Sequence, residues 1–471
     1  MEIESASPEQ ARLEAEVGDR LDRLPVGSWH RRLVALVGIG TVFTFFEAAL
    51  GAVLVPLLPA GWVVTTADKS IVIGSVFVGE ILGALFLVPL ADRFGRRTMF
   101  QVNLAGYAVL AVISAFASDL PTFVVLRVLM GIGLGAELIL VDSFLAELLP
   151  AARRGRMIGQ CYVFGYLAPA AVGLLAAFLP RKLAGIDSWR WLLVFSALGA
   201  VVVLLLRRHL PESPRWLAAR GQNRAALTAM SRIETAAARL SGPSPTVRHQ
   251  APSRVGDDTS AHGAIADDES GRAVPLRMWH PPLLNRTLLA SIIWTCQTVG
   301  YYGFASIAPL VLLEKGFTVT KSLGYTGFTA LGYPLGALLM MVSAERIQRK
   351  YLLVAASLVV ACLGIVFGVA DATWLIVVAG FGLTVANVVM GNVSHAYTSE
   401  LFPTSLRATA NGRTYSLSRG MSAVLPFIAL PILYNLGSGI LYVLCALILV
   451  VVAAAVLIWG PHTNARQLES I

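Results

Sequence analysis

The apolar residues of this chain are gathered into long blocks, and each block is long enough to cross a lipid bilayer. A bilayer core of about 30 Å takes about 20 apolar residues per helix. Twelve such blocks lie at 33–58, 71–91, 98–117, 121–145, 156–180, 189–207, 287–313, 322–343, 351–370, 374–398, 409–433 and 437–460. Over the whole chain 56% of the residues are hydrophobic and 14% are charged. The sequence therefore predicts an all-α membrane protein with twelve transmembrane helices.

Arginine and lysine cluster in alternate loops, at 92–97, 153–156, 346–350 and 407–413. Because cytoplasmic loops carry such an excess, we expect both termini in the cytoplasm and the chain in a plasma or bacterial inner membrane. The net charge of +9 fits this bias and attraction to anionic lipid. No basic stripe with interleaved aromatics indicates nucleic-acid binding. The four cysteines lie singly without CxxC spacing, so we expect neither a metal nor another cofactor.

A polar stretch at 208–286 divides the chain into two halves of six spans each. We expect one or two short surface helices within 213–240 and disorder at 241–275, because that part is rich in Ser, Pro, Gly and Asp. The predicted parts are listed in order: a cytosolic segment 1–32, an N-terminal six-helix bundle 33–207, the cytosolic linker 208–286, a C-terminal six-helix bundle 287–460 and a cytosolic tail 461–471.

A short charged phrase occurs once in each half. "ADRFGRR", which contains Asp92, returns as "AERIQRK", which contains Glu345, at an offset of 345 − 92 = 253. Glu147 and Glu400 lie in a second pair of related phrases with the same offset. Two motifs that share one spacing indicate an internal duplication, with the halves as parallel repeats.

This architecture, with these loops, resembles the major facilitator superfamily, whose most specific signature is the Asp-Arg-x-Gly-Arg-Arg loop. "LPESPRWLAARGQ", "RVLMGIGLGAELILVDSFLAELLP" and "SELFPTSLRATANG" are similar to the branch of sugar porters, organic-ion carriers and metabolite:proton symporters. "RLDRLPVGSWHRR" and "GYYGF" look most like the metabolite:proton symporters, which include nicotinate and aromatic-acid carriers. The resemblance implies two pseudo-symmetric six-helix bundles that open alternately to the two sides of the membrane.

The charged loops are expected to act as a gate. An acid at the end of the second span can accept hydrogen bonds from a helix N-terminus of the other half, and the arginines can pair with acids such as Glu147. The alternative is that the arginines only set topology. The candidate gating residues are Asp92, Arg93, Gly95, Arg96, Arg97, Glu147, Arg154, Glu345, Arg346, Arg349, Glu400 and Arg407.

Acids inside the spans are the candidates for proton coupling, since buried charges are costly and usually functional. At 1.5 Å per residue, Glu47 and Arg127 both lie about 21 Å from the cytosolic side, which predicts an ion pair in a central cavity. An acid in span 1 with an arginine in span 4 resembles the coupling pair of sugar and metabolite symporters. Glu137, after three spaced glycines, is an equal candidate, and Glu80 is a third. For Asp142 we favour a structural ion pair.

Span 7 carries the candidate substrate contacts. Trp294, Gln297 and Tyr301 share one helical face at i, i+3 and i+7, and Tyr302 stands beside them. An aromatic and amide face of this kind suits a planar organic solute.

Arg419 in span 11 could hold a solute carboxylate together with Arg127, or could instead pack against an acid of span 2 or 10. Asn387 and Asn392 are polar residues of span 10 that we expect chiefly to bond between helices. His395 is expected at the cytosolic rim.

The predicted function is secondary active transport by alternating access, with proton-coupled uptake of a small organic metabolite, a carboxylate or aromatic acid. We expect a monomer whose partners are its solute, protons and membrane lipid. No ATP-binding loop and no catalytic set appears, so an enzyme is not expected. The open alternatives are a sugar or polyol symporter, a facilitator or efflux carrier of organic cations or drugs, and a non-transporting sensor.

Overall fold

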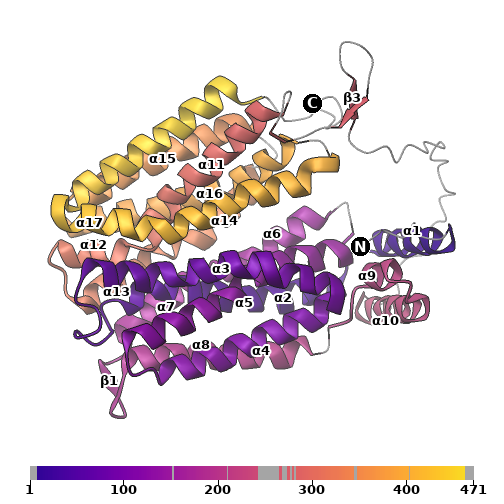
Figure 1. The fold of residues 1–471 in the computed structure, drawn as a ribbon, viewed down its shortest axis with the longest axis horizontal. Coiled ribbons are helices and arrows are strands. Elements are labelled where there is room, and N and C mark those ends of the chain that lie inside the picture. Colours follow the sequence, from indigo (N-terminus) through magenta and orange to yellow (C-terminus); the bar gives the residue numbers. More distant parts are fainter. Residues whose placement is uncertain are drawn as a thin grey trace.

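The computed structural model describes residues 8–150, 153–208, 210–241, 265–267, 273–275, 278–279, 283–343, 347–402 and 404–461. Two bundles of helices lie side by side, the earlier part of the chain in one and the later part in the other (Figure 1). We call the helices α2 to α8 the N half and the helices α11 to α17 the C half. The boundaries of the five parts predicted from the sequence stay a proposal.

The described residues of the N half form seven helices, two of which make one broken span. They are α2 (Ser28–Leu54), α3 (Thr66–Phe94), α4 (Arg96–Ala115), α5 (Leu120–Leu148), α6 (Arg154–Gly165), α7 (Ala168–Phe178) and α8 (Ser188–Arg207). The break between α6 and α7 comes directly before Pro169, whose ring cannot continue the helical hydrogen bonding. A small hairpin of β1 (Lys182–Leu183) and β2 (Ile186–Asp187) joins α7 to α8.

The C half repeats this plan with more interruptions. Its helices are α11 (Leu284–Ala305), α12 (Ala308–Glu314), α13 (Val319–Thr329), α14 (Gly332–Ser343), α15 (Arg349–Val369), α16 (Thr373–Glu400) and α17 (Thr404–Trp459). The axes of α11 and α12 differ by 50°. The long α17 is two helices joined at Gly437, whose φ is 85°.

The predicted twelve-span fold is confirmed. In the described residues nine helices are long and apolar enough to cross a membrane, with α6 and α7 counted as one, and α11 with α12 makes ten. The shorter pair α13 and α14 fills the predicted span 322–343, and Gly437 divides α17 into the last two predicted spans.

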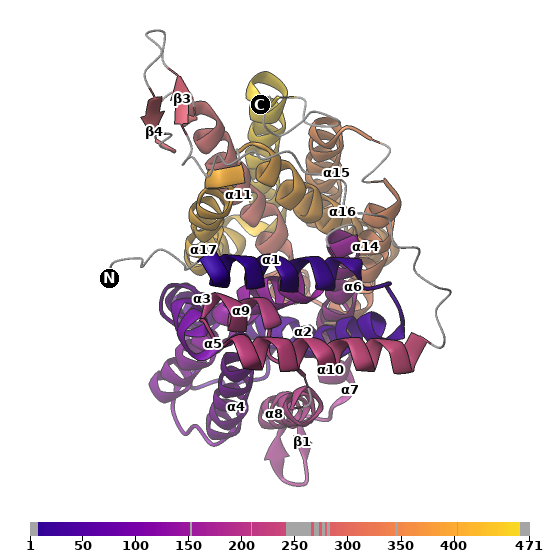
Figure 2. The same ribbon diagram turned by 90° about the vertical axis from the view of Figure 1, so that its right-hand side faces the viewer.

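Three amphipathic helices cover one end of the N half. They are α1 (Pro8–Arg23), α9 (Pro214–Ala219) and α10 (Asn223–Ser241), and Figure 2 shows them crossing that end. Buried apolar side chains of α1 and α10, such as Leu21 and Met230, join the core of the N half. The helices expected within 213–240 are therefore present, whereas α1 is a helix that the sequence analysis did not predict. We call this the motif end, because the Arg93–Arg97 loop lies there, and the other the opposite end.

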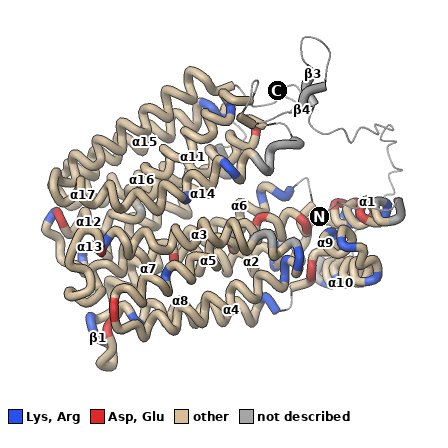
Figure 3. Tube along the Cα trace, in the orientation of Figure 1, with Lys and Arg blue, Asp and Glu red and all other residues tan. Residues whose placement is uncertain are grey.

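The stretch 241–275, for which we predicted disorder, lies mostly outside the described residues. Within it, β3 (Ile265–Asp267) pairs antiparallel with β4 (Ala273–Pro275). Charged residues gather near the two ends of the bundles, and few lie along the spans (Figure 3). This distribution is what a bilayer imposes on a spanning protein.

Contacts between the halves are found toward the opposite end. Ser70 Oγ donates to the Pro426 carbonyl oxygen at 3.0 Å, and Lys69 Nζ lies 4.1 Å from the Tyr434 ring centre. A Cβ atom added to Gly173 would lie 2.6 Å from Gly327 Cα, so α7 and α13 pack backbone to backbone. From there the halves diverge toward the motif end (Figure 1).

Candidate functional site

An ion pair joins the two halves at their centre. Arg419 Nη1 of α17 lies 2.8 Å from Glu80 Oε2 of α3, and their side chains are only 14% and 5% exposed. The same guanidinium group donates to the Tyr302 hydroxyl at 2.8 Å and to the Tyr415 hydroxyl. Of the two roles weighed for Arg419, the structure therefore places it against an acid of span 2.

Aromatic rings surround this pair. The ring of Tyr302 packs edge to face against Phe77 of the N half, with the ring centres 4.9 Å apart. The ring centres of Tyr301 and Tyr302 are also 4.9 Å apart. Tyr166 of the N half stacks on Tyr333 of the C half at 6.3 Å with an interplanar angle of 19°. We call these rings, with Glu80, Arg419, Tyr415 and Trp294, the central cluster.

The duplication is visible in the central cluster. Glu80 and Tyr333 are 253 residues apart, and so are Tyr166 and Arg419. The two contacts between the halves, Glu80 with Arg419 and Tyr166 with Tyr333, therefore involve equivalent positions of the repeat. One contact is ionic and the other is an aromatic stack.

Three predicted solute contacts carry buried polar atoms without a hydrogen-bond partner in the described residues. These atoms are Trp294 Nε1, Gln297 Oε1, and Oδ1 and Nδ2 of Asn387. Gln297 faces α16, because a Cβ atom on Gly391 would lie 3.5 Å from its Nε2. A buried polar group without a partner costs about 1–3 kcal/mol, so a ligand that supplies the missing bonds would be favoured.

Of two expectations for residues near the central cluster, the ion pair for Asp142 is wrong, and the rim position of His395 stays a prediction. His395, expected at the rim, is exposed but packs against the rings of Trp294 at 4.5 Å and Tyr415 at 5.4 Å. Asp142, for which we favoured an ion pair, instead accepts a hydrogen bond from the Tyr162 hydroxyl at 2.8 Å and is exposed. Side chains of both residues are thus accessible beside the central cluster.

The predicted ion pair of Glu47 and Arg127 is present, with Glu47 Oε1 2.6 Å from Arg127 Nη1. Its expected place in a central cavity is wrong, because neither side chain has any exposed surface. Tyr107 donates to Glu47 at 3.0 Å and contacts the Ser196 hydroxyl. All four residues belong to the N half, so Arg127 and Arg419 do not hold a carboxylate together. Sequence reasoning missed Tyr107 and Ser196, which are ordinary polar residues of apolar spans.

Glu137 has a buried arginine as its partner. Arg207 Nη1 of α8 lies 2.5 Å from Glu137 Oε1, and Asn103 Nδ2 lies 3.3 Å from Glu137 Oε2. Arg207 also donates to the Val37 carbonyl at 3.0 Å. A Cβ atom on Gly40 would lie 1.8 Å from Arg207 Nη2, so only glycine leaves room for the guanidinium group.

The predicted pairing of the motif arginines with acids is confirmed at the motif end. Arg96 Nε lies 3.1 Å from Glu147 Oε1 in the N half, and Arg349 pairs with Glu400 in the C half. The two pairs are related by the 253-residue offset. Each ties the start of the third span of its half to the end of the fourth.

Glu212, between α8 and α9, is a contact of the motif loop that the sequence analysis missed. Its Oε1 accepts from the Arg97 backbone N–H at 3.1 Å, at the N-terminus of α4, where a negative charge is favourable. Gly95 precedes that helix with φ 97°, and a Cβ atom there would lie 2.5 Å from Glu212 Oε2. The "PESPR" stretch thus docks on the loop, and only glycine fits between them.

The structure describes the side chains of only some of the remaining gating candidates. Arg154 donates to the Leu149 carbonyl at 3.3 Å and lies 3.9 Å from Asp22 of α1. Arg93 is exposed, with its guanidinium group 5.5 Å from the Phe94 ring centre. The side chains of Asp92, Glu345, Arg346 and Arg407 lie outside the described residues.

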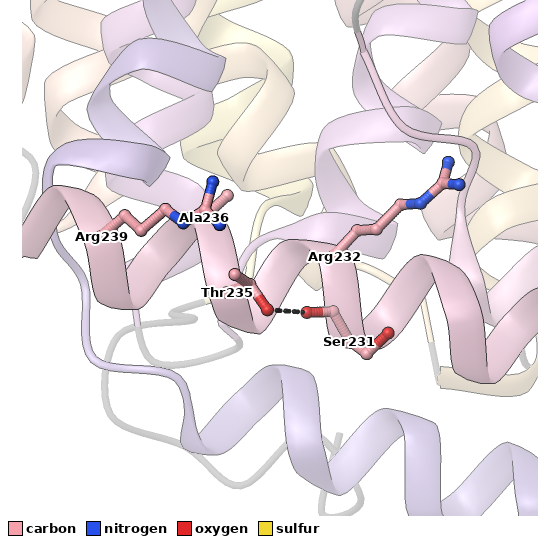
Figure 4. Close-up of a pocket in the computed structure, with 5 residues that line it drawn as sticks. All are labelled: Ser231, Arg232, Thr235, Ala236 and Arg239. Atoms are coloured by element: carbon pink, nitrogen blue, oxygen red, sulfur yellow. Dashed lines mark hydrogen bonds between the residues drawn. The ribbon is translucent and has the colours of Figure 1, made fainter.

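A surface hollow of about 430 Å³ lies along α10 (Figure 4). It is lined by Ser231, Arg232, Thr235, Ala236 and Arg239. The hollow is at the motif end, on a helix outside the spans, so it is not part of the candidate site. Within the described ranges, no group of three or more His, Cys, Asp or Glu residues is placed to hold a metal ion.

Two repeated six-span halves joined around a buried charged centre define a transporter of the major facilitator superfamily. The chain belongs to the sugar (and other) transporter family, whose family model matches residues 47–471. It is therefore a multi-pass membrane transporter of sugar or metabolite type and not an enzyme.

Individual relatives cover almost the whole chain. A protein of Bacillus subtilis (strain 168) named as metabolite transport protein YyaJ is 30% identical over 96% of this chain and 97% of its own. The niacin transporter NiaP of Acinetobacter baylyi is 28% identical over 96% of this chain and 98% of its own. The inward open structure of the xylose transporter XylE from E. coli has a TM-score of 0.72 at 18% identity, covering 93% and 98% of the two chains.

Proposed function

We propose that this chain imports a small organic metabolite, a carboxylate or aromatic acid, together with protons, by alternating access. The observation that carries the proposal is the ion pair of Glu80 and Arg419 between the halves, with aromatic rings around it. The niacin transporter among the relatives supports the solute class, because niacin is an aromatic acid.

The ion pair suggests how a proton and an anion could move together. While Glu80 is ionised, it occupies the Arg419 guanidinium group at 2.8 Å. A proton on Glu80 would remove that charge and leave Arg419 free to bind a solute carboxylate. One proton would then be bound with each anion, and the bond between the halves would be replaced by bonds to the solute.

The two ion pairs within the N half are further candidates for coupling. Glu47 and Glu137 each lie against one arginine, at 2.6 and 2.5 Å, with almost no exposed surface. Protonating either acid would leave a buried guanidinium group unbalanced and loosen the packing of α2, α5 and α8. We propose that they transmit the change of state, whereas Glu80 takes the proton at the interface.

We propose that the motif end faces the cytoplasm and that solute leaves there. The arginine-rich loops lie at that end, and the halves diverge toward it (Figure 1). The pairs Arg96 with Glu147 and Arg349 with Glu400, and the docking of Glu212 on Arg97, would then stiffen each half as it moves.

Transport in proteoliposomes tests the proposal. We expect labelled pyridine-3-carboxylate to accumulate when the outside is made more acidic than the inside. Glu80→Gln cannot take up a proton, so it should lose accumulation and its dependence on pH while still exchanging labelled for unlabelled solute. Asp371→Asn, which removes an exposed acid in a loop, is the charge-matched control. Accumulation by Glu80→Gln at the wild-type level contradicts the mechanism.

The unpaired polar atoms favour a second candidate, a sugar or polyol. Trp294 Nε1, Gln297 Oε1 and the Asn387 amide could bond hydroxyl groups, which need no charged partner. A hexose that competes with uptake in the wild type and in Arg419→Gln alike would support this candidate. Uptake that ignores the proton gradient would indicate a facilitator, and absence of transport with ligand binding would indicate a sensor.

A further inference from the structure

One acid inside the spans differs from the others in having no arginine. Glu47, Glu80 and Glu137 lie 2.6, 2.8 and 2.5 Å from an arginine nitrogen. Asp142 of α5 has no cationic partner in the described part of the chain, and it accepts a hydrogen bond from the Tyr162 hydroxyl at 2.8 Å. An acid within a span that has no arginine partner usually faces a water-filled cavity and marks a pathway for a solute or an ion.

The surroundings of Asp142 are aromatic and open. The Asp142 side chain is exposed, so a ligand can reach it. Tyr162, its hydrogen-bond donor on α6, has its ring centre 6.3 Å from that of Phe45, and the Phe45 ring centre lies 5.3 Å from that of Tyr166 in the central cluster. A cation bound at this carboxylate would also lie near the Tyr162 ring, whose face attracts positive charge.

The charge balance of the centre points in the same direction. Arg419 is already balanced by Glu80, and Arg127 is sealed inside the N half with Glu47. Among the described side chains Asp142 therefore leaves one negative charge uncompensated beside the central cluster. A solute that carried only a carboxylate would add a second negative charge there.

We infer that Asp142 recognises a basic nitrogen of the transported solute. The inference rests on the proposed function and deepens it: the solute is a compound with an acidic group for Arg419 and a basic nitrogen, such as a heteroaromatic ring nitrogen or an amine, for Asp142. The carboxyl group of Asp142 and the nitrogen of the solute share one proton. This proton is bound in addition to the one on Glu80. It enters and leaves with the solute, so Asp142 is ionised again when the site is empty.

The other titratable groups near Asp142 leave it as the acceptor of this proton. On α6 the neighbours are Tyr162, which donates to it, and Cys161, which is buried. Across the interface stand Tyr415, which accepts from Arg419, and His395, which packs on Trp294. Glu137, five residues before Asp142 on α5, is also an acid, but it is already paired with Arg207, so Asp142 is the acid left to accept the proton.

Equilibrium binding to the purified full-length protein at neutral pH tests the inference with three labelled probes. Pyridine-3-carboxylate has both groups, benzoate has the acid alone, and benzylamine has the nitrogen alone. We expect the wild type to bind pyridine-3-carboxylate more tightly than benzoate. Asp142→Asn should weaken binding of the two nitrogen probes about 10- to 100-fold, as expected for loss of a hydrogen bond to a charged group, and should leave benzoate within about twofold. Asp371→Asn should change none of the three affinities.

Each outcome separates the inference from the proposed function. Equal binding of pyridine-3-carboxylate and benzoate, in wild type and Asp142→Asn alike, overturns the inference and leaves an acid transporter. Binding of benzylamine that depends on Asp142, without binding of either acid, supports the inference and rejects the acid as solute class. Absence of binding by both nitrogen probes overturns the inference. Tyr162→Phe keeps the carboxylate and should keep the preference for nitrogen, so loss of that preference in Tyr162→Phe also counts against it.

Discussion

Buried arginines in this protein depend on small residues beside them. Arg207 reaches Glu137 only because its guanidinium group occupies the space next to Gly40. Its side chain is 1% exposed and holds both the Glu137 carboxylate and the Val37 carbonyl. The guanidinium group therefore cannot move aside without giving up bonds that are hard to replace inside the N half.

Gly40→Ala is expected to destabilise the protein strongly. The added methyl group would displace the Arg207 guanidinium group and leave Glu137 a buried charge without its partner, which typically costs about 3–5 kcal/mol. Thermal unfolding in detergent measures the loss. Gly106→Ala on α4 is the matched control, since a Cβ atom there meets nothing within 4 Å. A Gly40→Ala protein as stable as Gly106→Ala would show that the pair has room to shift.

Depth along a helix was enough to predict one buried pair but not the others. Glu47 and Arg127 lie well inside their blocks, so their similar depth could be worked out from the rise per residue. Arg207 is the last residue of its block and looks like a topological arginine. Which face of α8 it occupies depends on helix packing, and the sequence alone does not provide that. The same holds for Asp142, whose Tyr162 partner comes from another helix.

Single residues also determine where the helices end or break. Gly437 has φ 85° and separates the two helical parts of α17. A residue with a side chain is strained in this left-handed region, at about 1–2 kcal/mol.

Gly437→Ala should therefore lower stability by about 1 kcal/mol without loss of transport, because the turn lies far from the central cluster. Gly412→Ala on the same element should be neutral or stabilising, since it lies within a helix and a Cβ atom there meets nothing within 4 Å. Unfolding midpoints of the two variants make the comparison. Equal midpoints would mean that the turn relaxes to accept a side chain.

The N-terminus of α5 should respond to acid. Asp119 caps this helix, and hydrogen bonds from the Thr122 backbone N–H and side chain lower the pKa of the Asp119 carboxyl. Because its folded-state pKa is depressed, its contribution to stability is fully present above the unfolded pKa of about 3.9 and is lost as the pH falls through the folded value.

Asp119→Ala should therefore lower the melting temperature at neutral pH, and its disadvantage against the wild type should shrink as the pH falls below about 4. Melting curves between neutral and acidic pH check this. A disadvantage that stays constant across that range would mean that the carboxylate does not act as the cap.

At the level of elements, hydrophobic blocks predicted every span, because a bilayer tolerates few other solutions. The breaks within the spans were harder to predict from the sequence. Pro169 and Pro309 lie inside predicted blocks, but whether a proline bends or interrupts a span depends on its neighbours. The helix α1 was missed because it is polar and charged, and its apolar face has meaning only against α9 and α10.

At the opposite end the two halves of the molecule approach each other closely at a glycine. A Cβ atom on Gly327 of α13 would lie 2.5 Å from the Leu174 backbone nitrogen of α7. A Cβ atom on Gly324 of the same helix would lie 3.7 Å from the Ala177 Cβ, an ordinary contact. The approach of the halves at the opposite end is therefore sensitive to one position and tolerant at its neighbour.

Gly327→Ala should shift the protein toward states in which the opposite end is open, whereas Gly324→Ala should not. A reporter is Ser70→Cys, since Ser70 is buried between the halves and bonds Pro426. We expect a membrane-impermeant maleimide to label this cysteine faster in the Gly327→Ala background, with Cys362 replaced by serine. Equal labelling in both glycine variants would mean that the contact does not limit opening.

For the whole molecule, two copied phrases were enough to predict a duplicated fold, and the paired salt bridges Arg96 with Glu147 and Arg349 with Glu400 agree with that. The arrangement of the halves against each other was not predictable in the same way. It depends on contacts between residues hundreds of positions apart, such as Glu80 with Arg419.

The repeat positions at the centre carry unlike contacts: an ionic bridge, Glu80 with Arg419, on one side, and the flat stack of Tyr166 and Tyr333 on the other. A solute bound between these two contacts would face a charged surface on one side and an apolar aromatic surface on the other. The two surfaces would keep their places when the transporter changes its conformation. The solute should therefore keep one binding orientation throughout the transport cycle. Positional isomers of one ring compound, equal in size and charge, should accordingly be carried at very different rates.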